Sequence, residues 1–145
     1  MQEAVKAQIN IARIIFIGLL IGQFLFYFFI QYILTGRATL FNEAFANHWL
    51  YWVLPFLTFG GFYGAYRFGK MRKKKFSELG DDIKKASHYR ETAIMQGAIM
   101  ELANLFSIIT ALLTFSFLPF MFFALGLVIF LFFFPTEAKF ERFDQ

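Results

Sequence analysis

Residues 14–36 read IIFIGLLIGQFLFYFFIQYILTG and contain no charged side chain. As an α-helix, these 23 residues rise by ~1.5 Å each, which is enough to cross the ~30 Å hydrocarbon core of a bilayer. The stretch therefore predicts a transmembrane helix over about residues 10–35.

The rest of the chain contains enough apolar sequence for three more such helices. Residues 49–66 form a second uncharged run of 18, and residues 102–136 form a third of 35, which is too long for one span. Pro119 favours a turn or the first turn of a helix, and Pro135 favours a helix end. We therefore predict spans over about residues 48–68, 89–115 and 118–134, with a very short hairpin between the last two.

The composition agrees with a lipid environment. Apolar residues make up 59% of the 145 residues and charged residues 17%, and phenylalanine alone occurs 24 times. A soluble domain of this size could not bury so many aromatic side chains, whereas in lipid they can face outward. The predicted fold class is all-α transmembrane, a four-helix polytopic bundle that forms a single domain over residues 1–145.

The distribution of Lys and Arg predicts the orientation of this bundle. Thirteen of the 14 basic residues fall on one side of a four-span arrangement, and only Arg37 falls on the other. Because basic residues concentrate on the cytoplasmic side of membrane proteins, we predict that both termini are cytoplasmic (N-in, C-in). We expect a multi-pass protein of the bacterial cytoplasmic (inner) membrane.

Residues 69–88 are expected to form a helical hairpin that projects into the cytoplasm. Gly80 stands where a glycine ends a helix, and Asp81 or Asp82 can cap the next one. Basic side chains beside a membrane helix attract anionic lipids, at ~1 kcal/mol each, and we expect no nucleic-acid partner. The residues predicted to contact anionic lipids are Arg67, Lys70, Arg72, Lys73, Lys74 and Lys75.

Glu101 lies near the middle of the third predicted span. A carboxylate at that depth is expensive and usually faces the interior of a bundle, so it is a candidate functional group. On a helix with ~100° per residue, Asn104 and Gly97 share a small, polar face, which Gln96 and Ser107 flank. One hypothesis is a proton or cation site made by Glu101, Asn104, Gln96 and Ser107. The other is an uncharged Glu101 that hydrogen-bonds a neighbouring helix.

Glycines recur at the spacing that lets helix backbones approach closely. Gly18 and Gly22 form a GxxxG pair in the first span, and Gly60 and Gly64 form another in the second. Together with Gly97 they are predicted to be helix-packing residues. Both packing within the bundle and packing between copies of the chain are consistent with the pattern.

The chain shows two resemblances to known protein families, one over residues 98–113 and the other over the whole chain. The stretch AIMELANLFSIITALL, residues 98–113, resembles the carboxylate helix of the rotary-ATPase proteolipids, the c-type subunits, which implies ion binding at Glu101. The glycine-rich partner helix and the polar loop of that family have no clear counterpart here. The whole chain resembles small bacterial four-span proteins of unknown function, in which a YR pair, a mid-span Glu and a proline after the fourth span recur. Here these are Tyr89-Arg90, Glu101 and Pro135.

No sequence pattern indicates an enzyme or a cofactor site. HExxH, GxSxG and Walker motifs are absent from the sequence, and so is cysteine. His48 and His88 fall at opposite ends of the predicted bundle, so they cannot hold one haem. Two functions therefore remain. One is a structural or accessory subunit that packs with other membrane subunits or with copies of itself, and the other is proton or cation translocation through Glu101.

Overall fold

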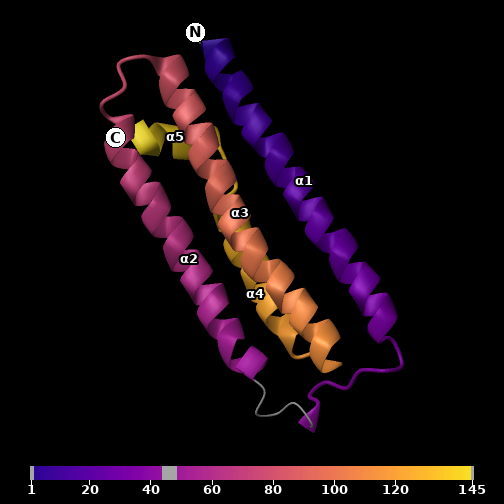
Figure 1. Ribbon diagram of the computed structural model, residues 1–145. Coiled ribbons are helices and arrows are strands. Elements are labelled where there is room, and N and C mark those ends of the chain that lie inside the picture. Colours follow the sequence, from indigo (N-terminus) through magenta and orange to yellow (C-terminus); the bar gives the residue numbers. More distant parts are fainter. Residues whose placement is uncertain (1, 44–48, 145) are drawn as a thin grey trace.

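The computed structural model describes residues 2–43 and 49–144. His48, where the second predicted span begins, lies outside them. The described chain is all-α, as predicted (Figure 1). Its helices are α1 (Gln2–Leu34), α2 (Trp49–Phe76), α3 (Asp82–Thr114), α4 (Pro119–Phe132) and α5 (Glu137–Asp144).

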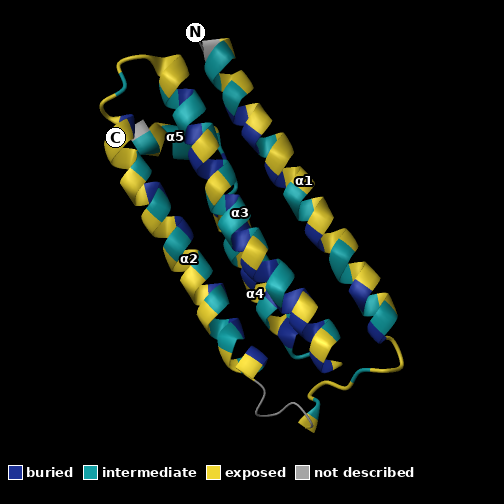
Figure 2. Cartoon of the chain, viewed as in Figure 1, coloured by how far each residue is buried: buried dark blue, intermediate teal, exposed yellow. Residues whose placement is uncertain are grey.

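Helix α3 is the central element of the bundle. It packs against α1, α2 and α4, and Figure 2 shows buried residues along its length. The face that it buries consists mainly of small and hydroxyl-bearing side chains, which let neighbouring backbones approach. Helix α1, in contrast, exposes large apolar side chains such as Ile14, Leu25 and Phe28.

Two helices, α1 and α3, are long and apolar enough to cross a membrane. Helices α4 and α5 meet that criterion only as a pair, which is bent by 69°. Alone, the 14 residues of α4 would reach only ~21 Å at ~1.5 Å per residue. The structure therefore supports a membrane protein with two candidate spans, or three if the bent pair is one span.

Both termini and the turn at residues 77–81 lie at one end of the bundle, which we call the basic end (Figure 1). Here α2 continues through the lysine run and ends at Phe76. Gly80 lies in the turn of the predicted helical hairpin, but it does not itself end α2, because that helix stops four residues earlier and Gly80 does not have a positive φ. Asp81 is the predicted N-cap of α3, and its carboxylate accepts a hydrogen bond of 3.1 Å from the Ile83 amide.

At the far end of the bundle, residues 115–118 connect α3 to α4. Phe115 ends α3 in the left-handed conformation, with φ 49°, and Pro119 begins α4, as its place in the sequence predicted. The turn pairs with the segment that follows α1. The Thr39 amide donates to the Phe115 carbonyl at 3.2 Å, and the Phe117 amide donates to the Thr39 carbonyl at 3.0 Å.

Helix α5 was not predicted, since no helix was expected after the fourth span and Pro135. Its Phe140 and Phe143 contact Phe76 of α2, with ring centroids 5.8 and 5.0 Å apart. Both also contact Tyr89 of α3, and Ile9 of α1 completes this buried cluster. Residues from three other helices thus hold α5 at the basic end.

Candidate functional sites

Glu101 lies on the side of α3 that faces α1, at the boundary between the buried and the exposed surface. Its neighbours one turn away on α3 contact α1, because Gly97 packs on Phe16 and Asn104 binds Gln23. Leu102, the next residue, is 72% exposed. Among the described residues, the partly buried Glu101 carboxyl has no hydrogen-bond or ion-pair partner.

Asn104 belongs to a different contact, which joins three helices. Its Nδ2 donates to Oε1 of Gln23 at 2.7 Å, and both side chains are almost completely buried. Its Oδ1 lies directly against Gly126 of α4, at the place where any larger residue would put a Cβ. Gln23 is the tenth residue of the uncharged run 14–36, so this polar contact is near the middle of the apolar part of the bundle.

Gln96 and Ser107 also have partners other than Glu101. Gln96 Nε2 donates to the Ala65 carbonyl of α2 at 2.9 Å and lies against Gly69. Ser107 Oγ donates to the Ala103 carbonyl within α3 at 3.2 Å. Gln96 faces α2 whereas Glu101 is on the α1 side. The described contacts therefore do not join the four predicted site residues into one ligand set.

The predicted packing glycines divide into two groups. Gly97 is in contact, since a Cβ there would lie 2.6 Å from the ring of Phe16. For Gly18, Gly22, Gly60 and Gly64, a Cβ would meet nothing within 4 Å. Of the two alternatives, the described residues show no packing of these four glycines within the bundle. Packing between copies of the chain stays a prediction for them.

Close helix contacts are instead made by glycines outside these two GxxxG pairs. Gly61 faces Ala103 and Met100, Gly69 faces Gln96, and Gly126 faces Asn104. In the last two cases a side-chain amide occupies the space. The GxxxG spacing could not identify these positions, because the choice of face depends on which neighbour each helix meets.

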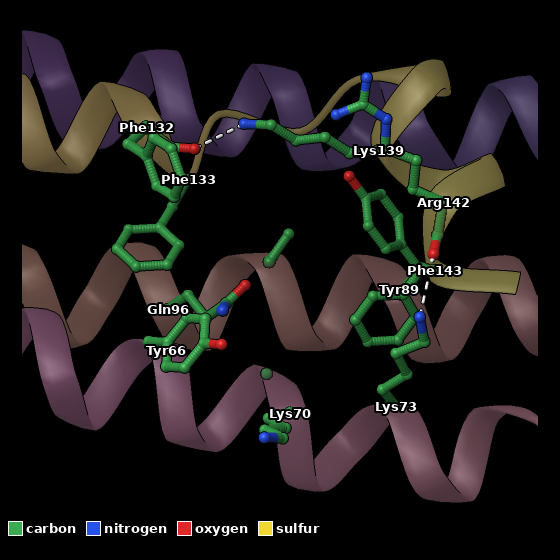
Figure 3. A pocket seen from close by; sticks show the side chains of 12 residues that line it. Tyr66, Lys70, Lys73, Tyr89, Gln96, Phe132, Phe133, Lys139, Arg142 and Phe143 are labelled. Carbon is green, nitrogen blue, oxygen red and sulfur yellow. Dashed lines mark hydrogen bonds between the residues drawn. The ribbon is translucent and has the colours of Figure 1, made fainter. Parts of the chain in front are cut away.

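A second candidate site is a cavity of about 400 Å³ at the basic end. It lies between α2, α3 and the bend that connects α4 to α5, and we call it the elbow pocket (Figure 3). Four cationic residues line it, two from α2 and two from α5: Lys70, Lys73, Lys139 and Arg142. No Asp or Glu is among the described residues that line it.

Backbone carbonyls hold two of these cations in place. Lys139 Nζ donates to the carbonyls of Phe132 and Phe134. Its positive charge there offsets the partial negative charge at the C-terminal end of α4. Burial lowers the pKa of the Lys139 amino group from its ordinary 10.5. Lys73 Nζ donates to the Arg142 carbonyl at 3.1 Å. These contacts fix α5 next to α2 and form the outer wall of the pocket.

The sequence identified only half of this site. Lys70 and Lys73 were predicted to contact anionic lipids as members of the basic run. Lys139 and Arg142 were expected only to lie on the cytoplasmic side with the other basic residues, and no pattern in the sequence shows that the chain bends by 69° after α4. The amphipathic spacing of Phe140 and Phe143 was the one available signal that residues 137–144 form a docked helix.

Comparison of the chain with models of known protein families, with curated proteins and with solved structures finds no match.

Proposed function

We propose that this chain is a small polytopic membrane protein that crosses the bilayer four times and serves as a structural or accessory subunit. Its assembly is a larger membrane complex or a homo-oligomer. In this proposal α2 and α4 are spans in addition to α1 and α3, and the basic end is cytoplasmic. The polar and charged termini and the residue 77–81 turn gather at one end of the bundle, which supports an even number of crossings.

The observation that carries the assembly role is the position of Glu101. A carboxyl group in the apolar part of a bundle is stabilised only when it finds a hydrogen-bond partner. Glu101 has no partner in the described chain and is not enclosed by it. A donor from another chain, at the α1 side of α3, would supply the missing interaction.

Two further features support a partner at this membrane level. The faces of Gly18 and Gly22 on α1 and of Gly60 and Gly64 on α2 are open, and small residues of this kind are frequent where membrane helices associate. Lipid can cover exposed apolar side chains, so these faces do not by themselves require a protein. The unpartnered carboxyl distinguishes assembly from simple contact with lipid.

Ion translocation through Glu101 is the second candidate. The same unpartnered carboxyl favours it, because a carboxyl at the edge of a membrane helix is open to an incoming proton or cation. The predicted ligands weigh against a site within one chain, since Asn104, Gln96 and Ser107 all bind other atoms. A transport site would need oxygen atoms from another chain, so both functions depend on assembly.

The experiment is purification of the tagged chain in mild detergent, with mass measurement and identification of co-purifying chains. We expect a defined assembly for the wild type. Glu101→Leu should weaken it, whereas Glu101→Gln, which keeps hydrogen-bonding capacity, should retain most of it. Leu102→Ala, on the exposed side of α3, is the matched control and should have no effect. A monodisperse monomer with no partner in native membranes would refute the assembly role.

Ion flux in reconstituted vesicles separates the two functions. If the chain is only a structural subunit, wild type and Glu101→Gln should both be indistinguishable from empty vesicles. If Glu101 carries ions, flux should be present in the wild-type assembly and lost in Glu101→Gln, although the assembly keeps its mass.

A further inference from the structure

Two of the cations that line the elbow pocket have no counter-charge in the described chain. Lys70 and Arg142 are exposed, and no described residue forms a hydrogen bond or ion pair with either side chain. The Arg142 contact to Lys73 uses the backbone carbonyl, so the guanidinium group itself is available. With Lys73 and Lys139, the pocket brings four positive charges together without an acidic residue in its lining.

The same pocket has an aromatic side that continues toward the apolar part of the bundle. Phe132 and Phe133 end α4, and Tyr66 lies across from them on α2, one turn before Lys70. Figure 3 shows these rings at one side of the pocket, and Lys73 and Arg142 at the other. Tyr66 and Phe132 are 51% and 63% exposed, so this side is open to the surroundings of the bundle.

We propose that the elbow pocket is a specific binding site for one anionic phospholipid. The headgroup phosphate lies between Lys70 and Arg142, which Figure 3 shows at opposite edges of the pocket; both side chains are exposed and held by no hydrogen bond or ion pair in the described chain, so they can turn toward it. The acyl chains leave the pocket over Tyr66 and Phe132. Lys73 and Lys139 keep the bend between α4 and α5 in place and add positive charge behind the phosphate. This inference concerns a site that neither the assembly role nor ion transport uses.

The chemistry of the lining favours a phospholipid over a free phosphate ion. Both ligands would use the same cations, because guanidinium and ammonium groups donate strong, charge-assisted hydrogen bonds to phosphate oxygens. Only a lipid would also cover the exposed rings next to those cations. The position agrees with this choice, since the pocket lies where an apolar helix ends and a basic segment begins.

The site differs from the general attraction that a basic run exerts on a membrane. General attraction depends on the number of charges near the surface, so all lysines of the run should contribute alike. Binding in a pocket depends instead on where each cationic side chain lies. Lys74 and Lys75 belong to the same run and are exposed, but they do not line the pocket. They therefore provide a matched control that removes the same charge.

The test is native mass spectrometry of the purified full chain during titration with dioleoyl phosphatidylglycerol. We expect the wild type to retain one lipid per chain at saturation and to retain dioleoyl phosphatidylcholine much more weakly. Lys70→Gln combined with Arg142→Gln should weaken phosphatidylglycerol binding by about 30-fold, on the basis of ~1 kcal/mol for each hydrogen bond to the phosphate that is lost. Lys74→Gln combined with Lys75→Gln should change it by less than about twofold.

Each alternative has its own result. Equal losses in the two double variants, or equal retention of the two lipids, would overturn the proposal in favour of general attraction. Displacement of the lipid by inorganic phosphate at a similar concentration would show a site for the free ion. Circular dichroism checks that the Lys70→Gln and Arg142→Gln variant is folded, which is expected because both side chains are exposed. A folded variant that binds phosphatidylglycerol like the wild type would also refute the site.

Discussion

Gly126 shows how one residue without a side chain can fix the centre of this bundle. Its position on α4 is filled by the Asn104 side chain, which in turn binds Gln23 on α1. Gly126→Ala would place a Cβ where Asn104 Oδ1 lies, and the buried amide would have to leave Gln23. We expect the variant to be less stable by about 1–3 kcal/mol, the usual cost of overpacking.

The measurement is unfolding of monomeric, detergent-solubilised protein by SDS, followed by circular dichroism. Gly60→Ala is the control, because its Cβ meets open space and alanine is the better helix residue by about 0.5–1 kcal/mol. The destabilisation should shrink when Gly126→Ala is combined with Asn104→Ala, which removes the overlapping atom. If Gly126→Ala lowers the stability equally in the Asn104→Ala variant, the contact with Asn104 is not what requires glycine at this position.

At the scale of elements, α5 depends on one buried ring of α2. Phe76 is fully buried and contacts Phe140 and Phe143 of α5. Phe76→Ala should cost about 3–5 kcal/mol if the cavity does not collapse. Because α5 has only eight residues, it should then detach, and amide exchange over residues 137–144 should become fast.

The matched control is Phe59→Ala, on the same helix but 55% exposed. It should leave the exchange of residues 137–144 unchanged. Since Lys139 and Arg142 are on α5, Phe76→Ala should also weaken lipid binding at the elbow pocket. Retained protection of α5 in Phe76→Ala would mean that the lysine contacts to backbone carbonyls are sufficient to hold it.

At the scale of the whole molecule, the four-span proposal makes a direct prediction about topology. A reporter that is active only in the cytoplasm should work when fused after Lys75 or Gln145, because the basic residues gather at that end. It should be inactive when inserted at Asn42, which is at the far end and donates to the Thr114 carbonyl at 3.1 Å. Activity after Asn42 would contradict the proposed number of crossings.

Several features could be predicted from the sequence because they depend on local chemistry. An uncharged run of 23 residues predicts a helix, since unpaired backbone groups are too costly in an apolar environment. Pro119 at the start of α4 and Asp81 as a cap follow from the hydrogen-bonding limits of single residues. These conclusions required no knowledge of what the helices pack against.

The tertiary structure alone decided which side chains meet. The sequence places Glu101, Asn104 and Gln96 within nine residues of one helix, but Asn104 binds α1 and Gln96 binds α2. The GxxxG spacing of Gly18 and Gly22 is compatible with packing, yet contact requires a neighbour on that face, and in this chain the face is open. The elbow pocket combines residues about 70 positions apart, and it exists only because α5 bends back onto Phe76. Helix formation is a local property, whereas the choice of partner depends on shape and polarity that distant segments supply together.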